Sequence, residues 1–313
     1  MTTSSKASST TKSKPRIAAT MRAQMVRTVE AVMAADERVV LLLADVGVEQ
    51  FRGALRAYPT RALNVGIMEQ TLVSAGAGMA LEGFIPVMHT IAPFLVERAF
   101  EQIKDDFCFQ GLGGSFISIG ASYDYSTEGM THHAPGDVQI LRSLPGMRIV
   151  VPGTPGEFDN IFRAAYADAA PTYYRLSVAR NAEDRPARFG RAVTLRRGRA
   201  ATVIAVGPLL DAALAASEGL DVTLLYYTTV APFDGETLRR SHEGGPVVLV
   251  EPFYAGTLTP AVVAALAPQP VRVEAIGVPR EVLTRYGTPE QHDAALGLTP
   301  GGIRARLAQL IPA

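Results

Sequence analysis

The stretch RALNVGIMEQTLVSAGAGMALEG, residues 61–83, decides the fold class. Its apolar residues first alternate, at Leu63, Val65 and Ile67, which is the period of a short strand. A run of small and apolar residues then follows Glu69, and this composition predicts a tightly packed helix that ends at Gly83. We therefore expect Glu69 at the carboxyl end of a strand and in the first turn of a helix. Open α/β sheets bind their ligands at that place.

The small apolar residues after Glu69 predict that its carboxylate is poorly hydrated. Poor hydration raises the pKa of a carboxyl group. A carboxyl group that keeps its proton near neutral pH can share that proton with a ring nitrogen of a bound cofactor. In a second interpretation, Glu69 is an ordinary acidic residue that the positive end of the helix dipole stabilises. The local pattern leaves both interpretations open.

Composition places the chain among globular proteins. It has 313 residues, of which 48% are hydrophobic and 19% charged, so two domains with a sizeable core are expected. Thirty basic residues balance 30 acidic ones, and nothing in this charge points to nucleic acid or an anionic membrane. The single cysteine, Cys108, excludes an internal disulfide and a cysteine-based zinc site. We interpret it as a core thiol in a reducing compartment.

The chain divides into four segments. Residues 1–16 are rich in Ser, Thr and Lys and lack an apolar segment, which predicts a disordered tail and not a signal peptide. Apolar runs such as VVLLLA, residues 39–44, alternate with expected helices such as residues 94–106. Over residues 17–180 this alternation predicts a doubly wound α/β domain. Residues 181–198 are rich in Arg and are expected to be a linker. A second, smaller α/β domain is expected over residues 199–313.

Location follows from what the sequence lacks. There is no run of 18 apolar residues, so a transmembrane helix is not expected. We therefore expect a cytoplasmic protein.

Three stretches combine, and the first of them lies within residues 61–83. They are GIMEQ (66–70), HTIAPFLVERAFEQI (89–103), and STEGMTHHAPGDVQILRSLPGM (126–147), which VVPGTP (150–155) follows closely. In this order and at these separations they resemble the transketolase family of thiamine diphosphate enzymes. The similarity is greatest to the second subunit of split transketolases, which carries the pyrimidine-binding domain and the C-terminal domain. It extends over about residues 20–310.

The resemblance implies roles at the cofactor. Glu69 is similar to the glutamate that hydrogen-bonds N1′ of the cofactor's aminopyrimidine. Phe94 is similar in position to the aromatic residue that stacks on this ring, and Ile91 and Glu97 would lie at neighbouring positions of the pocket. Phe94 is also compatible with an ordinary core residue.

The resemblance also implies roles at the substrate. The sequence Glu128-Gly-Met-Thr-His132 resembles the family's Asp-Gly-Pro-Thr-His, in which the acid and the histidine reach the sugar hydroxyls and the reacting carbonyl. Glu128 and His132 are therefore substrate candidates, with His132 as a proton donor or acceptor. His133 and His89 are further candidates. There are two alternatives: a metal site made of His89, His132 and His133, or a solvated polar loop without a function. The three histidines do not have the spacing of metal ligands on a helix.

Two departures from the family concern the substrate. Several transketolases carry a histidine about eight residues before that acid, where this chain has Gly120. A phosphate-binding arginine is not clearly placed either, and Arg175 and Arg180 are both candidates because guanidinium binds phosphate bidentately. These departures favour a specialised acceptor over the housekeeping pentose-phosphate reaction.

Half of the cofactor site is missing. Full-length relatives hold Mg²⁺ and the diphosphate through a Gly-Asp-Gly motif, which occurs nowhere in this sequence. The glycine-rich pieces GAGMALEG and GLGG lack the context of a dinucleotide site and are interpreted as close-packing glycines. The resemblance therefore implies a partner chain that carries the diphosphate half, in an α₂β₂ assembly.

The leading hypothesis is one subunit of a thiamine-diphosphate-dependent transferase. It would move a two-carbon ketol unit from a ketose, or a ketose phosphate, to an aldehyde. The alternatives are a 2-oxo acid dehydrogenase β-subunit, a decarboxylating enzyme like deoxyxylulose-phosphate synthase, and a catalytically silent assembly or regulatory subunit.

Overall fold

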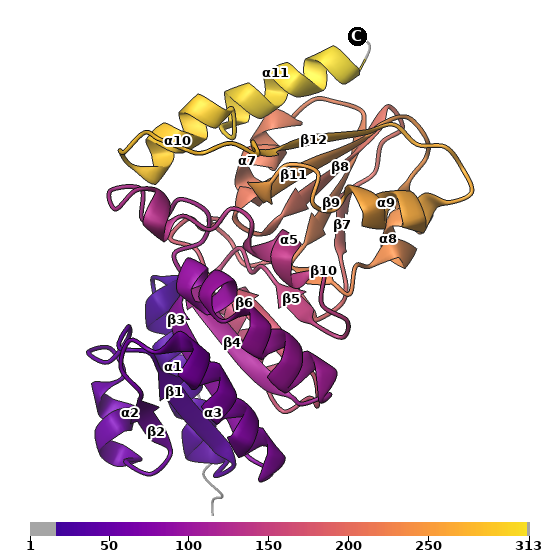
Figure 1. Cartoon of the computed structure of the whole chain (residues 1–313). Coiled ribbons are helices and arrows are strands. Elements are labelled where there is room, and N and C mark those ends of the chain that lie inside the picture. The colour runs from indigo at the N-terminus through magenta and orange to yellow at the C-terminus, as the bar shows by residue number, and fades with distance from the viewer. Residues whose placement is uncertain (1–16, 312–313) are drawn as a thin grey trace, which may run out of the picture.

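The computed structural model describes residues 17–311, in which two mainly parallel sheets are packed with helices (Figure 1). The predicted fold class, α/β with two doubly wound domains, is confirmed. The predicted disordered tail, residues 1–16, lies outside the described residues.

The first sheet has seven strands in the order β10-β5-β6-β4-β3-β1-β2. All neighbours are parallel except β10, which runs antiparallel to β5. Every residue of β1 and β4 is buried, as the continuous apolar runs predict for strands covered on both faces. The strands are β1 (Val39–Leu43), β2 (Ala62–Asn64), β3 (Ile85–Ile91), β4 (Gly114–Ile119), β5 (Arg148–Val150), β6 (Pro171–Arg175) and β10 (Thr229–Ala231).

Helices connect these strands. As predicted, Glu69 lies in the first turn of a helix, α3. The helices α1 and α6 begin after Thr20 and Thr154, whose side chains each accept a hydrogen bond from a backbone N–H of the first turn. The predicted helix over 94–106 forms instead as two π-helical segments, η1 and η2, on either side of the short α4. The helices of this part are α1 (Met21–Ala35), α2 (Arg52–Ala57), α3 (Glu69–Leu81), η1 (Phe94–Arg98), α4 (Phe100–Gln102), η2 (Ile103–Phe109), η3 (Met130–His132), α5 (Asp137–Leu141) and α6 (Pro155–Ala165).

The second sheet has five strands in the order β12-β11-β8-β9-β7. They are β7 (Val193–Arg196), β8 (Ala201–Val206), β9 (Val222–Tyr227), β11 (Val247–Tyr254) and β12 (Val273–Val278). Their helices are η4 (Gly207–Leu209), α7 (Leu210–Ala216), α8 (Gly235–Ser241), α9 (Thr259–Leu266), α10 (Pro289–Leu296) and α11 (Pro300–Leu310).

The predicted linker, residues 181–198, is wrong over its second half. This part contains β7, which pairs antiparallel with β9 and belongs to the second sheet. Val193 and Leu195 of this strand pack against the core of the second domain. The surrounding arginines masked this short apolar alternation in the sequence.

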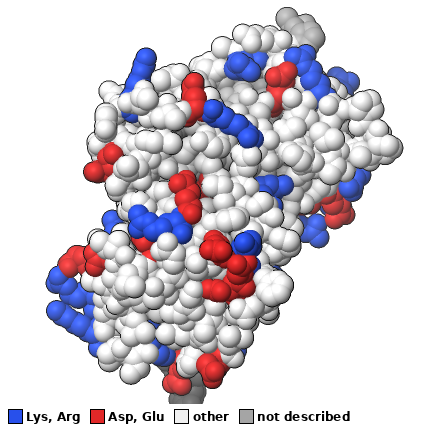
Figure 2. All heavy atoms as spheres, viewed as in Figure 1, with Lys and Arg blue, Asp and Glu red and all other residues white. Residues whose placement is uncertain are grey.

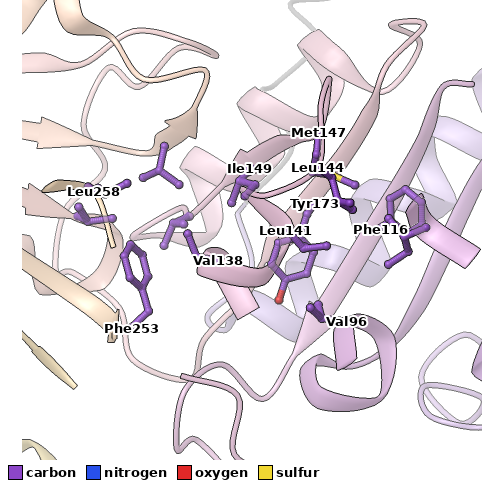
Figure 3. Close-up of a cluster of buried hydrophobic side chains, with 14 of the residues drawn as sticks. Val96, Phe116, Val138, Leu141, Leu144, Met147, Ile149, Tyr173, Phe253 and Leu258 are labelled. Atoms are coloured by element: carbon purple, nitrogen blue, oxygen red, sulfur yellow. The ribbon is translucent and has the colours of Figure 1, made fainter. Parts of the chain in front are cut away.

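The two sheets share a hydrophobic core. One cluster of buried side chains contains Val138, Leu141 and Ile149 from the first domain and Phe253 and Leu258 from the second (Figure 3). The chain also crosses between the sheets, because β10 follows β9 in sequence yet pairs with β5. The domains are therefore packed against each other as one body.

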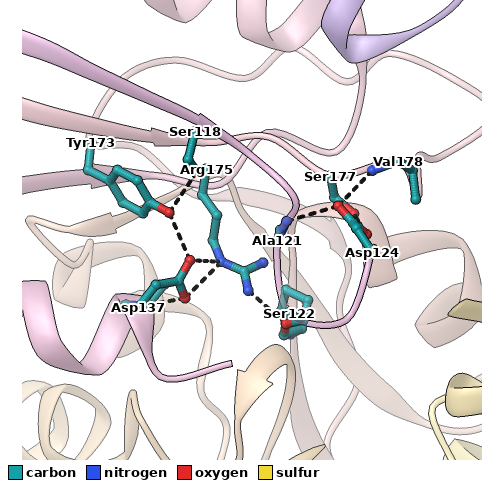
Figure 4. A network of polar contacts seen from close by, with 11 residues as sticks. Ser118, Ala121, Ser122, Asp124, Asp137, Tyr173, Arg175, Ser177 and Val178 are labelled. Carbon is teal, nitrogen blue, oxygen red and sulfur yellow. Dashed lines mark hydrogen bonds and ion pairs between the residues drawn. The ribbon is translucent and has the colours of Figure 1, made fainter. Parts of the chain in front are cut away.

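A buried polar network lies in the same region (Figure 4). Arg175 on β6 donates from Nε to Asp137 on α5 over 2.8 Å, and the two side chains are 1% and 0% exposed. The Tyr173 hydroxyl donates to the same carboxylate, and the Arg175 Nη2 donates to Ser122 Oγ over 2.7 Å. Ser122 in turn donates to the carbonyl of Pro252 in the second domain. The network therefore ties the end of the first sheet to β11.

Replacing Arg175 by Met is expected to lower the free energy of unfolding by about 3–5 kcal/mol, because Asp137 would be left charged, buried and unpaired. Urea unfolding of the purified chain measures this change. Arg199→Met removes an ion pair whose arginine is 86% exposed and is the matched control, with an expected change below about 0.5 kcal/mol. Equal effects of the two substitutions would contradict the structural role of the buried pair.

Candidate functional site

Glu69 stands in the first turn of α3, as the sequence predicts, and a turn over residues 65–68 separates it from the end of β2. The turn before it depends on Gly66, whose φ of 76° favours glycine, and on Asn64. The Asn64 Oδ1 accepts hydrogen bonds from the backbone N–H groups of Asp45 and Gly66, which joins the ends of β1 and β2. The Glu69 residue is only 1% exposed, so the expected poor hydration of its carboxylate is confirmed.

The structure adds a partner for Glu69 that the sequence did not reveal. Arg98, the last residue of η1, donates from Nη1 to the Glu69 Oε2 over 2.7 Å. The same guanidinium lies over the ring of Phe94, with 4.4 Å between Cζ and the ring centroid. Arg98 therefore gives the buried Glu69 carboxylate a charge-assisted hydrogen bond.

His132 continues this row of side chains. Its ring meets the ring of Phe94 edge-to-face at 5.2 Å and the ring of Tyr125 at 6.2 Å between centroids. The Nδ1 of His132 lies 3.0 Å from the hydroxyl of Thr131, a contact that orients the imidazole. Glu69, Arg98, Phe94 and His132 therefore form one continuous chain of contacts at the carboxyl edge of the first sheet.

Tyr125 explains why no histidine stands at residue 120. Gly120 has a φ of 77°, and a Cβ built there would lie 2.5 Å from the Tyr125 ring. The tyrosine therefore fills the space that a longer side chain at this position would need. Ile91, a predicted cofactor residue, also lies close to this position, because its Cγ2 would be 2.9 Å from the same Cβ.

The other predicted site residues divide by exposure. Glu97, Glu128 and Arg180 are exposed and His132 is half-buried, so a ligand can reach all four. Partial burial, with the nearby charge of Asp137, raises the pKa of Glu97.

Three predicted substrate residues are buried, and we withdraw their assignment to substrate. Arg175 forms a buried ion pair with Asp137. His133 is 2% exposed and packs against His292 of the second domain, and burial lowers its pKa. His89 is fully buried beside Phe51, and its Nδ1 donates to the carbonyl of Ile117 over 2.8 Å. Sequence neighbourhood suggested these residues, but the registers of β3 and β6 turn His89 and Arg175 inward. His133 follows η3 and is buried by its contact with the second domain.

A cavity of about 250 Å³ adjoins this row of side chains. It lies between the amino end of α1 and the carboxyl ends of β4 and β6, and Tyr125 is common to the cavity and the His132 cluster. Arg22 and Arg180 both line it, and the Arg22 Nε is buried without a hydrogen-bond partner among the described residues. The sequence pattern does not indicate Arg22, because it precedes Arg180 by more than 150 positions.

Two of the described side chains suit the ring of a cofactor. The buried carboxylate of Glu69 and the ring face of Phe94 fit one planar, nitrogen-containing ring. Within residues 17–311, no group of three or more His, Cys, Asp or Glu side chains could hold a metal ion. Basic and acidic side chains are interspersed over the face shown in Figure 2. No helix in the described part of the chain has the length and hydropathy needed to cross a membrane.

Comparison with known families matches both domains. The family described as transketolase, pyrimidine binding domain matches residues 18–181, and the one described as transketolase, C-terminal domain matches residues 190–303.

Individual proteins are also similar to this chain. An uncharacterized 33.6 kDa protein in the fasciation locus of Rhodococcoides fascians is 40% identical, over 87% of this chain and 88% of that protein. The 6-deoxy-6-sulfo-D-fructose transketolase subunit SqwH of Clostridium sp. (strain MSTE9) is 30% identical, over 84% and 86%. The 1-deoxy-D-xylulose-5-phosphate synthase of Oleidesulfovibrio alaskensis is 30% identical over 88% of this chain, which spans 46% of that enzyme's length.

A solved structure titled "Split gene transketolase, inactive beta4 tetramer" has the same fold. Its TM-score is 0.80 at 27% identity, and the match covers 93% of this chain and 97% of that one.

His89 predicts a pH dependence of stability. Burial lowers the pKa of His89 from 6.5 to about 4. The hydrogen bond to Ile117 opposes this change, and the positive charge of Arg22 adds to it. Between pH 4 and pH 6.5, His89 is protonated in the unfolded chain but stays neutral in the folded chain. The contribution of His89 to the free energy of unfolding is therefore complete above pH 6.5 and is lost as the pH falls toward 4. His89→Asn keeps a donor toward Ile117 but does not titrate.

Relative to that variant, the native chain is expected to lose about 3 kcal/mol of unfolding free energy over this window. Urea unfolding of both proteins across the pH range measures the difference. A difference that does not vary with pH would contradict the neutral, buried state of His89.

Proposed function

The chain belongs to the transketolase family, and from this premise we propose that it is one subunit of a thiamine-diphosphate-dependent enzyme. The enzyme transfers a two-carbon ketol unit from a ketose to an aldehyde. The observation that carries the proposal is the buried carboxylate of Glu69 at the ligand-binding edge of the sheet, in one row with Phe94 and His132.

Glu69 and Phe94 would hold the cofactor's aminopyrimidine. Glu69 would hydrogen-bond N1′ and exchange a proton there. Phe94 would support the ring face. Thiamine diphosphate, when bound, supplies the electron sink for the carbanion chemistry. Ile91 and Glu97 would line the same pocket.

His132 and Glu128 would act on the substrate. The Nδ1 of His132 faces the Thr131 hydroxyl, so its Nε2 is the nitrogen that would exchange a proton with the substrate's carbonyl or hydroxyl oxygen. Glu128 is exposed at the start of the same turn and would accept hydrogen bonds from sugar hydroxyls.

A partner chain would complete the site. It would contribute the Mg²⁺ and diphosphate ligands, in an α₂β₂ assembly with this chain at the central contact. The relative SqwH is named as a subunit, and the solved neighbour is titled as an inactive β₄ tetramer, which suits a chain that needs a second component. On α3, Ser74 and Gly78 are exposed and Gly78 has no neighbour within 4 Å of a Cβ position, so another helix could approach closely.

The cavity lined by Arg22 and Arg180 would bind an acidic group at the far end of the sugar. Two guanidinium groups that converge on one cavity suit a phosphate or another oxyanion. The buried, unpartnered Nε of Arg22 supports this role, because a buried donor is expected to have an acceptor. Arg180 is therefore the better of the two predicted phosphate ligands.

A decarboxylating reaction is the second candidate, because the synthase relative aligns over most of this chain. Both reactions would use Glu69 in the same way. Release of CO₂ from a 2-oxo acid donor, measured with the reconstituted complex, would separate them.

Glu69→Gln is expected to reduce the turnover of the reconstituted complex by about 10²–10⁴-fold, because the amide cannot exchange the proton at N1′. Ketol transfer by this chain mixed with its copurifying partner, with thiamine diphosphate and Mg²⁺, is the measurement. Glu82→Gln at the exposed end of the same helix is the matched control and should retain activity. Unchanged turnover with Glu69→Gln would instead support a catalytically silent subunit. Full activity without a partner would overturn the shared site.

Arg22→Met is expected to raise the KM for a phosphorylated ketose donor about tenfold or more, since it removes a charge-assisted hydrogen bond. The KM for the corresponding unphosphorylated ketose should change little. Steady-state kinetics with the two donors tests this. An equal rise in both KM values would show that Arg22 supports the fold and not the anion.

A further inference from the structure

We propose that Arg98 is a placeholder for the cofactor's ring, which occupies the pyrimidine half-site in the uncombined subunit and leaves it when the cofactor binds. This inference rests on the proposed function, because it assigns Glu69 and Phe94 to the aminopyrimidine.

The contacts of Arg98 coincide with those proposed for that ring. The guanidinium hydrogen-bonds the Glu69 carboxylate over 2.7 Å and lies over the Phe94 ring at 4.4 Å. Guanidinium is planar and carries its N–H groups in the plane, so it can stack and donate at once, as an aminopyrimidine does. The side of the Phe94 ring that Arg98 covers cannot support the cofactor's ring at the same time. Arg98 and the cofactor therefore compete for one place.

The position of Arg98 follows from its helix. Phe94 and Arg98 are the first and last residues of η1, whose π-helical turn brings the guanidinium over the ring four positions earlier. Short π-helical segments of this kind are frequent at functional sites.

Burial makes the exchange of partners asymmetric. The Glu69 side chain is 2% exposed, whereas that of Arg98 is 40% exposed. A buried carboxylate without a partner is strongly destabilising, so Glu69 needs one in every state of the protein. Arg98 can return to water with little loss, because its head is already partly hydrated. In the uncombined subunit Arg98 is therefore the partner of Glu69, and the cofactor would replace Arg98.

The direct test is the affinity of the reconstituted complex for thiamine diphosphate with Mg²⁺, measured by calorimetry. Arg98→Met keeps the apolar stem and removes the competitor, so binding should tighten about three- to tenfold. Arg98→Lys keeps the charge but loses the planar fork and should lie between the two. Unchanged or weaker binding with Arg98→Met would overturn the proposal, because Arg98 would then be neutral or part of the loaded site.

Arg148 provides a matched control. It also pairs with a carboxylate, that of Asp168 at 2.6 Å, and also lies over an aromatic ring, that of Phe189 at 5.0 Å. It begins β5 and therefore lies at the amino edge of the sheet, opposite the site. Arg148→Met should leave the cofactor affinity unchanged. A similar tightening there would point to a general effect of losing a surface ion pair and would overturn the proposal.

A second measurement does not involve the cofactor. Thermal unfolding of the subunit alone, for Arg98→Met, Glu69→Gln and the double variant, forms a double-mutant cycle. The shifts in Tm should be non-additive by about 2 °C or more if Arg98 and Glu69 are paired in the uncombined chain. Additive shifts would overturn the placeholder even if the cofactor binds. Failure of every complex to bind the cofactor while the cycle is non-additive would instead reject the proposed function, and the placeholder with it.

Discussion

A carboxylate that is buried away from water must have a partner, and the arrangement of this molecule depends on how that requirement is met. Asp137 is paired with the equally buried Arg175, which joins the first sheet to the second domain. Glu251 accepts from the backbone N–H groups of Gly256 and Leu258, and burial still raises its pKa to about 7. These partners cannot leave without unfolding the chain. Glu69 differs, because its partner reaches in from the surface, and this difference separates a site from a structural element.

The second domain contributes to the site although it carries no catalytic candidate. The loop over residues 120–136 contains His132, and the second domain contacts it at several points. Tyr123 stacks on His292 at 5.0 Å between centroids, Ser122 donates to the Pro252 carbonyl, and Gly129 lies against Tyr286. The position of the imidazole therefore depends on contacts from both domains, and changes in the C-terminal helices are expected to shift His132.

The sequence predicted most of the fold, because long apolar runs such as those of β1 and β4 carry their own period. It missed β7 and β10, which have four and three residues and form only because a neighbouring edge is available to pair with. In the site, local position was enough to predict the burial of Glu69. Arg98 and Arg22 were missed since their roles come from proximity in space: one depends on a π-helical turn and the other on the packing of α1 against the ends of β4 and β6.

The crossing of β10 into the first sheet bears on how this chain can vary over evolutionary time. β10 covers the outer edge of β5, so the second domain supplies the strand that closes the sheet of the first. A recombination event that exchanged the second domain alone would replace this strand and could leave an open edge, which is prone to pair with other chains. The two domains are therefore expected to be inherited as one unit, with exchange tolerated at their surface loops and not at the junction between them.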